Sequence, residues 1–185
     1  RFIGGWVGAI AYDYVRFVER LPDENPDELR FDDVAMMLFD LVVVFDHAKN
    51  RIKIVALTDD SPGDEARALA AIERVAERLD GPLPKMPAPP WTPAPKMAAN
   101  LSRAEFEAIA ARCVDYMNAG DGVQVVPSLR LSGPFASDPI TLYRSLRSLN
   151  PSPFMFLLRL GDADVVGASP ELLVNLTGRR ARVRP

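Results

Sequence analysis

The sequence contains only one cysteine and one histidine in 185 residues. Cys113 has no second cysteine to pair with, which excludes an internal disulfide and is typical of a reducing compartment. His47 stands between two strand-like segments, and we predict an exposed turn residue because no serine or cysteine nucleophile is placed near it. Zinc-ligand spacing, a phosphate-binding loop and a Ser-His-Asp order are also absent, so the motifs of several enzyme classes are missing.

Long apolar runs and an excess of one charge are absent too. The longest apolar run, Val34 to Phe45, is interrupted by Asp40 and is too short to cross a bilayer. The net charge of −3 is small and both signs are scattered, which argues against a nucleic-acid or anionic-membrane partner. No signal-peptide pattern is visible. With 48% apolar and 25% charged residues, the composition is that of a soluble globular protein, and we expect a cytoplasmic location.

Proline, in contrast, is abundant and unevenly placed. Residues 81–95 hold seven of the 17 prolines, which predicts a semi-rigid extended linker. We therefore predict an N-terminal region over 1–80, a linker over 81–100 and a second domain over 101–185. The chain begins at Arg1 without methionine and stops at Pro185 inside a strand-like segment, so we expect a fragment of a longer protein.

Hydrophobic patterning predicts a protein with both strands and helices, in which strands outnumber helices. Strands are expected over 2–13, 34–46, 51–57 and 122–131, and helices over 14–21, 66–79, 102–119 and 138–149. Ser102 and Glu105 form a capping box before the third helix, and Gly120 is placed to end it.

The strand expected over 122–131 has two different faces. Gln124, Ser128 and Arg130 lie on one of them, between apolar residues that point the other way. This polar face predicts either the lining of a pocket or the wet side of a half-exposed sheet.

The stretch from Asn150 to Glu171 is the most distinctive. Pro151 disfavours helical angles at Asn150, so a helix ends there, and two strands follow around a turn at Gly161-Asp162. Ser169-Pro170-Glu171 has the N-cap, first-turn proline and first-turn acid of a helix start. Spacing alone predicts a hairpin with a capped turn. A strand that leads into a helix N-terminus is also a common way to hold an anion or a reactive carboxylate.

Several motifs, taken in order, resemble component I of anthranilate synthase, which belongs to the chorismate-utilising enzymes. They span the chain: Gly4–Gly8, Val42–His47, Gly120-Asp121, Gln124–Ser128, Asn150–Phe156, Gly167–Glu171 and Val183–Pro185. The resemblance implies an α+β fold, a two-layer α/β sandwich of antiparallel-rich sheets covered by helices. It also implies conversion of chorismate and ammonia to anthranilate and pyruvate, with Mg2+ as cofactor. A glutamine amidotransferase partner subunit would supply the ammonia.

The resemblance assigns two kinds of site residue. In the family, the Asn-Pro-Ser-Pro-aromatic-Met segment belongs to the site where tryptophan binds and inhibits. By that match Pro153, Phe154 and Met155 would contact tryptophan, and Asn150, Pro151 and Gly167 would shape its site. Met155 suits an indole ring because a flexible thioether packs well on aromatic rings.

Two further matches concern the reaction itself. Glu171 matches the family's acid that protonates the departing C4 hydroxyl of chorismate. That role favours a protonated carboxyl, which the positive end of a helix would oppose. Gln124 stands where relatives that add water carry a lysine, so its amide favours an enzyme that uses ammonia over an isochorismate or salicylate synthase.

The match also has departures and alternatives. Gly122-Val123 replaces a bulky apolar pair, and Leu129 replaces a glutamine. Aminodeoxychorismate synthase is the alternative enzyme, although it tends to carry alanine in place of Ser152. A non-catalytic tryptophan-binding fragment is the alternative of another class. The catalytic histidine and the Mg2+ ligands are expected beyond Pro185, so we nominate no metal ligand here and expect the isolated chain to be inactive.

Overall fold

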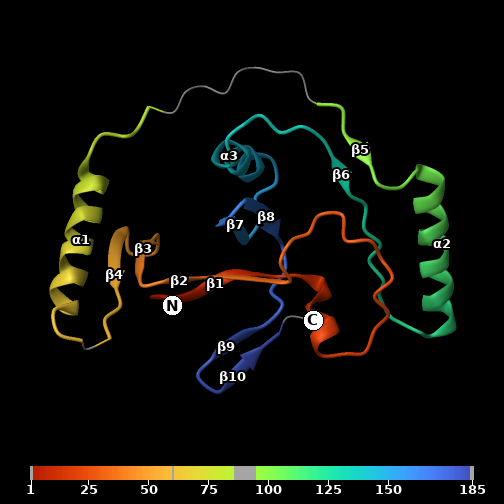
Figure 1. Ribbon diagram of the computed structural model, residues 1–185, viewed down its shortest axis with the longest axis horizontal. Coiled ribbons are helices and arrows are strands. Elements are labelled where there is room, and N and C mark those ends of the chain that lie inside the picture. The colour runs from red at the N-terminus through yellow and green to blue at the C-terminus, as the bar shows by residue number, and fades with distance from the viewer. Residues whose placement is uncertain (1, 60, 86–94, 184–185) are drawn as a thin grey trace. The chain divides into compact units, whose positions relative to one another are not determined.

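The structure is a computed structural model that describes residues 2–59, 61–85 and 95–183 (Figure 1). The chain divides into two compact units, and each is described by itself. Unit 1 comprises Arg1–Pro87 and Leu142–Pro185, and unit 2 comprises Ala88–Thr141. The regions expected over 1–80, 81–100 and 101–185 stay predictions. Residues 86–94 of the expected linker lie outside the described residues.

The first sheet of unit 1 pairs β1 (Gly5–Ile10) with β2 (Val34–Phe39) in antiparallel register. Gly8 faces Met36 in this register, and a Cβ built at Gly8 would overlap the carbonyl oxygen of Ala35. The absence of a side chain at Gly8 therefore permits the close approach of the β2 backbone. The residues between the two strands form the 3-10 helix η1 (Tyr12–Phe17) and a loop, so the helix expected over 14–21 is shorter and begins earlier.

The single strand expected over 34–46 is wrong, because the chain bends at Asp40. Beyond the bend, β3 (Leu41–Asp46) pairs with β4 (Arg51–Ala56) in an antiparallel hairpin. The carbonyl oxygen of Asp40 accepts a hydrogen bond of 2.7 Å from the Leu57 amide, so the bend is fastened to the end of β4. His47 lies exposed in the hairpin turn, as predicted.

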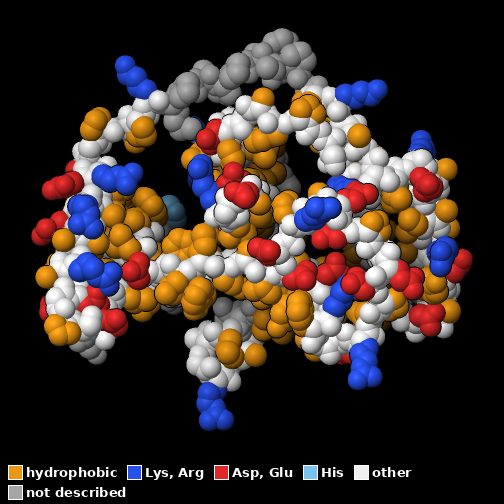
Figure 2. Space-filling view, viewed as in Figure 1, with side chains coloured by type: hydrophobic (Ala, Val, Ile, Leu, Met, Phe, Trp, Pro, Cys, Tyr) orange, Lys and Arg blue, Asp and Glu red, His pale blue; other side chains and the backbone are white. Residues whose placement is uncertain are grey.

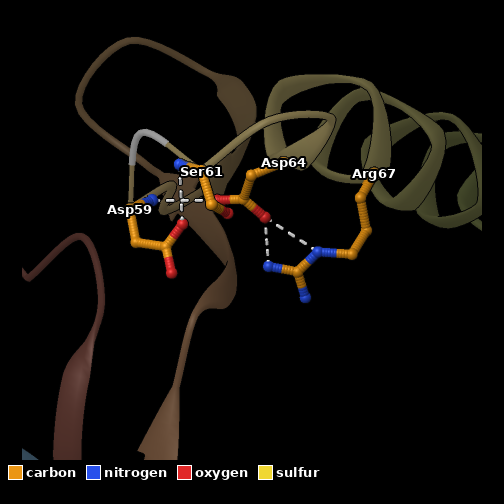
Figure 3. A network of polar contacts seen from close by, with 4 residues as sticks. All are labelled: Asp59, Ser61, Asp64 and Arg67. Carbon is orange, nitrogen blue, oxygen red and sulfur yellow. Dashed lines mark hydrogen bonds and ion pairs between the residues drawn. The ribbon is translucent and has the colours of Figure 1, made fainter.

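A network of polar contacts fixes the entry to helix α1 (Asp64–Asp80), which packs against β4 (Figure 3). The buried carboxylate of Asp64 accepts hydrogen bonds from the Asp59 amide at 2.8 Å and from Arg67 Nε at 2.8 Å. The Ser61 amide in turn donates to the Asp59 carboxylate at 3.1 Å. Hydrogen bonding with Ser61 lowers the pKa of Asp59, and hydrogen bonding with Asp64 raises the pKa of Arg67. The N-cap residue Gly63 makes no side-chain cap, so these bonds fix the loop that precedes the helix and do not satisfy its first amides.

The C-terminal part of unit 1 contains two hairpins. Strand β7 (Phe154–Leu160), which contacts β2, pairs with β8 (Ala163–Ser169). Their turn contains Gly161 at φ 60°, as expected from the sequence. The second hairpin pairs β9 (Asn175–Thr177) with β10 (Arg180–Arg182).

Unit 2 is built on α2 (Arg103–Ala119) and a short ladder of β5 (Ala98–Ala99) with β6 (Leu131–Ser132). The capping box is confirmed: the Glu105 amide donates to Ser102 Oγ at 3.3 Å, and the Ser102 amide donates to Glu105 Oε2 at 2.7 Å. Gly120 ends the helix at φ 86°. Helix α3 (Pro139–Leu149) starts in this unit, and its Asp138 carboxylate accepts the Ile140 amide at 2.7 Å.

Apolar side chains are exposed over much of the surface (orange in Figure 2). Within the described residues, no apolar side chain is fully buried. The mixture of helices with antiparallel strands confirms the α+β class. In the same residues, no helix combines the length and apolar character that a membrane crossing requires.

Candidate functional site

Most of the expected tryptophan-binding residues run from the end of α3 into the start of β7, and Gly167 lies on the neighbouring strand β8. The Asn150 amide makes the last helical hydrogen bond, to the Leu146 carbonyl at 2.8 Å, and α3 ends at Leu149. The stop predicted from Pro151 is therefore confirmed. Asn150, Pro151 and Pro153 are all exposed.

Strand register determines how the rest of this segment faces. Phe154 pairs with Ser169, Met155 with Ala168 and Phe156 with Gly167. Because side chains alternate along a strand, Phe154 and Met155 lie on opposite faces of the hairpin. A ligand that contacts both of these side chains must therefore lie across the edge or the end of the hairpin and not flat on one face.

Gly167 has a packing role that the sequence did not reveal. A Cβ built at this position would overlap the ring of Phe156, its partner on β7. The aromatic ring therefore occupies the space that a side chain at position 167 would fill. Because glycine has no Cβ, it allows the ring to pack there.

Ser152 is a further polar residue of this segment, and it was not among the predicted site residues. Its hydroxyl oxygen is buried and has no hydrogen-bond partner among the described residues. Such groups are rare in folded proteins because burying an unpaired hydroxyl costs free energy. The serine lies between the two prolines of the Asn150–Met155 segment, so it adds an unsatisfied polar atom there. Its place in the Asn-Pro-Ser-Pro motif was the available signal.

The hairpin with a capped turn that spacing alone predicted is confirmed, and the helix start that Ser169-Pro170-Glu171 resembles is wrong. The Glu171 amide donates to Ser169 Oγ at 3.3 Å, as in a helix cap, but the same hydroxyl donates to the Glu171 carbonyl at 3.0 Å. The serine thus closes a local turn with residue 171. The chain then continues without helix to β9, and the Glu171 side chain is exposed.

Gln124 lies in an irregular segment and not on the strand predicted for it. The strand expected over 122–131 is wrong except at Leu131, because residues 122–130 pair with no strand among the described residues. The segment is held near its end by Arg130, whose amide donates to Asn100 Oδ1 at 2.9 Å. Gln124 is exposed and belongs to unit 2, whereas Glu171 belongs to unit 1.

Two hollows adjoin the β3–β4 hairpin, away from the expected site residues. One has a volume of about 450 Å³ and is lined by Phe2 and residues 42–47. The other has a volume of about 220 Å³ and is lined by Phe45, Asp46, His47, Asn50, Arg51 and Ile52. Neither is lined by a residue expected to bind tryptophan or chorismate.

A Mg2+ site is not provided by the described residues. Among them, no group of three histidine, cysteine, aspartate or glutamate side chains is arranged to hold a metal ion. Asp46, the buried acid beside the second hollow, forms an ion pair with Lys53 at 3.4 Å.

Comparison with known proteins decides the family. The chain matches the chorismate binding enzyme family over residues 1–185. The chain belongs to this family. Anthranilate synthase component 1 of Thermus thermophilus is 46% identical over 184 residues, which cover 100% of this chain and 39% of that protein. The Pseudomonas aeruginosa component 1 is 41% identical over 192 residues, with 100% and 39% coverage.

Solved structures agree with this family membership. The crystal structure of anthranilate synthase component I from Streptococcus pneumoniae superposes with a TM-score of 0.83 at 28% identity. The match covers 96% of this chain and 41% of that chain. The predicted resemblance to anthranilate synthase component I and the predicted α+β fold class are thus confirmed. The chain spans about two-fifths of the length of the relatives it matches.

Proposed function

We propose that this chain is a segment of the large subunit of a cytoplasmic anthranilate synthase. In the complete enzyme, chorismate and ammonia would give anthranilate, pyruvate and water, as a step of tryptophan biosynthesis. The observation that carries the proposal is the 46% identity to the Thermus thermophilus component 1 along the whole of this chain. The name "component 1" also supports a partner subunit, for which we propose the ammonia-supplying glutamine amidotransferase.

Glu171 is the residue we assign to acid chemistry in that reaction. Its carboxyl would protonate the C4 hydroxyl of chorismate as that group leaves as water. The side chain is exposed and follows the last strand pair of the β7–β8 hairpin, so it is free to meet a substrate. No helix begins at this residue, so no helix N-terminus opposes a protonated carboxyl.

Gln124 is assigned to the choice of nucleophile. A neutral amide does not act as a base that activates water, which fits a reaction with ammonia. Mg2+ would be held by residues outside this chain. When bound, it would polarise and orient the carboxylates of chorismate.

We further propose feedback inhibition by tryptophan at the segment between α3 and β7. Pro153, Phe154 and Met155 would contact the amino acid, and Asn150, Pro151 and Gly167 would shape its site. The unpartnered hydroxyl of Ser152 supports a ligand with polar atoms at this place. Met155 is half-buried on one face of β7, where a thioether is suited to an indole ring.

Two alternative functions differ from the proposed one in what they do with chorismate. An aminodeoxychorismate synthase would aminate chorismate and keep the pyruvyl group on the ring. A non-catalytic regulatory fragment would bind tryptophan and leave chorismate unchanged. The serine at position 152 and the Met155-Phe156 pair favour anthranilate synthase over the first of these.

A hybrid enzyme tests the proposal. In this hybrid, residues 1–185 replace the matching 184 residues of the Thermus thermophilus component 1. With chorismate, Mg2+ and ammonium, we expect the hybrid to form fluorescent anthranilate and equimolar pyruvate. The isolated chain should form neither.

The two alternatives give other products. An amino compound that still carries the pyruvyl group would identify an aminodeoxychorismate synthase. Saturable tryptophan binding by a folded hybrid that does not consume chorismate would identify a regulatory fragment. Either result would contradict the proposed function.

A further inference from the structure

We propose that Ser169 is the positioning residue for Glu171. The proposal rests on the proposed function, because it assigns the group that orients the acid. Ser169 is the last residue of β8 and is half-buried, whereas Glu171 is exposed and lies two residues beyond the strand. The serine therefore stands on the paired backbone, and the glutamate does not.

The contacts between the two residues form a closed pair. Ser169 Oγ accepts the Glu171 amide at 3.3 Å and donates to the Glu171 carbonyl at 3.0 Å. One hydroxyl thus bonds to both backbone polar groups of residue 171: its O–H donates to the carbonyl, and one of its lone pairs accepts from the amide. Pro170, between them, has a fixed φ and no N–H group, so it offers no competing donor to the hydroxyl.

These two hydrogen bonds restrict a side chain that the surrounding structure does not orient. An exposed glutamate outside any helix or strand samples many orientations, and each catalytic encounter must select one of them. An acid misplaced by about 1 Å loses much of its effect on rate. The Ser169 hydroxyl restricts the backbone on both sides of the Glu171 Cα, which limits where its carboxyl can point.

Strand pairing extends this link to the proposed effector segment. Ser169 pairs with Phe154, and this is the final pair of the β7–β8 ladder. The two residues share a face of the hairpin because paired residues point the same way. A shift at Phe154 would therefore move the residue that holds Glu171.

The test uses the hybrid enzyme and two variants of Ser169. Ser169→Ala removes both bonds and should lower kcat about tenfold with KM changed less than twofold. Ser169→Thr keeps the hydroxyl and suits a strand, so it should restore kcat to within about threefold of the parent. A residue with only a structural role would not give this split between kcat and KM together with rescue by threonine.

Ser148→Ala is the matched control. It removes a hydroxyl bond to the Arg144 carbonyl of 3.1 Å on α3, so its kcat should equal that of the parent. An unchanged kcat in Ser169→Ala would overturn the proposal, as would a threonine variant no better than the alanine variant. Loss of thermal stability in the alanine variant with equal falls in kcat and bound chorismate would overturn it too. An inactive parent hybrid would instead refute the proposed function, so the two failures are separable.

Discussion

The β7–β8 hairpin leads to Glu171, two residues beyond the end of β8, whereas the segment 122–130 itself carries Gln124, the other residue assigned to chemistry. In the hairpin, seven consecutive residue pairs run from Phe154↔Ser169 to Leu160↔Ala163. The segment that carries Gln124 pairs with no strand among the described residues. Both regions are rich in apolar residues, so apolar composition does not explain the difference.

The cost of closing the chain explains it better. The two residues of the Gly161-Asp162 turn bring β7 and β8 together, so little entropy is lost before the pairs form. Residues 122–130 have no partner strand so close in sequence, and Pro127 removes one of their amide donors. A strand is stable only with a partner, and the hairpin contains its own.

The largest expected effect is catalytic and concerns Glu171, just beyond the hairpin. Glu171→Gln in the hybrid enzyme keeps the size of the side chain but removes the transferable proton. Anthranilate formation should fall by at least about 100-fold, because a general acid contributes about 10²–10⁴-fold. Glu107→Gln is the control: it removes an exposed ion pair with Arg103 and should leave the rate unchanged. A loss under threefold in Glu171→Gln would remove this residue from the mechanism.

Glycine substitutions compare the packing of the two regions. Gly167→Ala forces the added methyl group against the Phe156 ring and should lower the free energy of unfolding of the hybrid by about 1–3 kcal/mol. Gly122→Ala meets its nearest atoms only at 4.0 Å, so we expect a change within about 0.5 kcal/mol. Urea unfolding measures both. If adding Phe156→Ala does not reduce the cost of Gly167→Ala, the ring is not the cause.

Two positions on one face of the hairpin separate effector binding from stability. Met155→Ala should weaken tryptophan inhibition of the hybrid about tenfold and spare turnover, because a half-buried thioether contact is lost. Leu157 lies on the same face, two residues further along β7, and Leu157→Ala should lower the melting temperature without changing inhibition. Inhibition titrations with both variants decide this. Unchanged inhibition in Met155→Ala would remove the effector assignment.

The smallest expected effect concerns the start of α2 in unit 2. Hydrogen bonds with Ser102 lower the pKa of Glu105 from its ordinary value of 4.5. A lowered pKa means that this contribution to stability is complete well above pH 4.5 and is lost as the pH falls through the folded value. The protection of the first-turn amides of α2 against exchange should therefore fall as the pH falls below about 4.5, and it should fall less in Glu105→Gln. Identical pH profiles for the two proteins would exclude a role for the Glu105 charge.

Local signals were enough to predict the parts of the fold whose partners lie close in sequence. The capping box at Ser102 and Glu105 and the stop at Pro151 each depend on at most four neighbouring residues. The turn at Gly161 likewise joins strands that adjoin it. The strand expected over 122–131 failed because its formation depends on a partner that no local pattern specifies. The bend at Asp40 was missed for a similar reason: β2 pairs with the distant β1 and β3 with β4.

The candidate site was predictable only in part. The motif match identified the Asn150–Met155 segment and Glu171, and the structure places these around one hairpin. The capping pattern at Ser169 was recognised, but its hydroxyl bonds to both backbone groups of Glu171 and closes a turn where a helix was expected. The role of Gly167 depends on the cross-strand position of Phe156, which register alone determines.

The most direct test of the proposed function is the product that the hybrid enzyme makes from chorismate, Mg2+ and ammonium. The proposed function predicts anthranilate and pyruvate in equal amounts, with their formation abolished by Glu171→Gln. An amino product that keeps the pyruvyl group, or a folded hybrid that leaves chorismate unchanged, would contradict it.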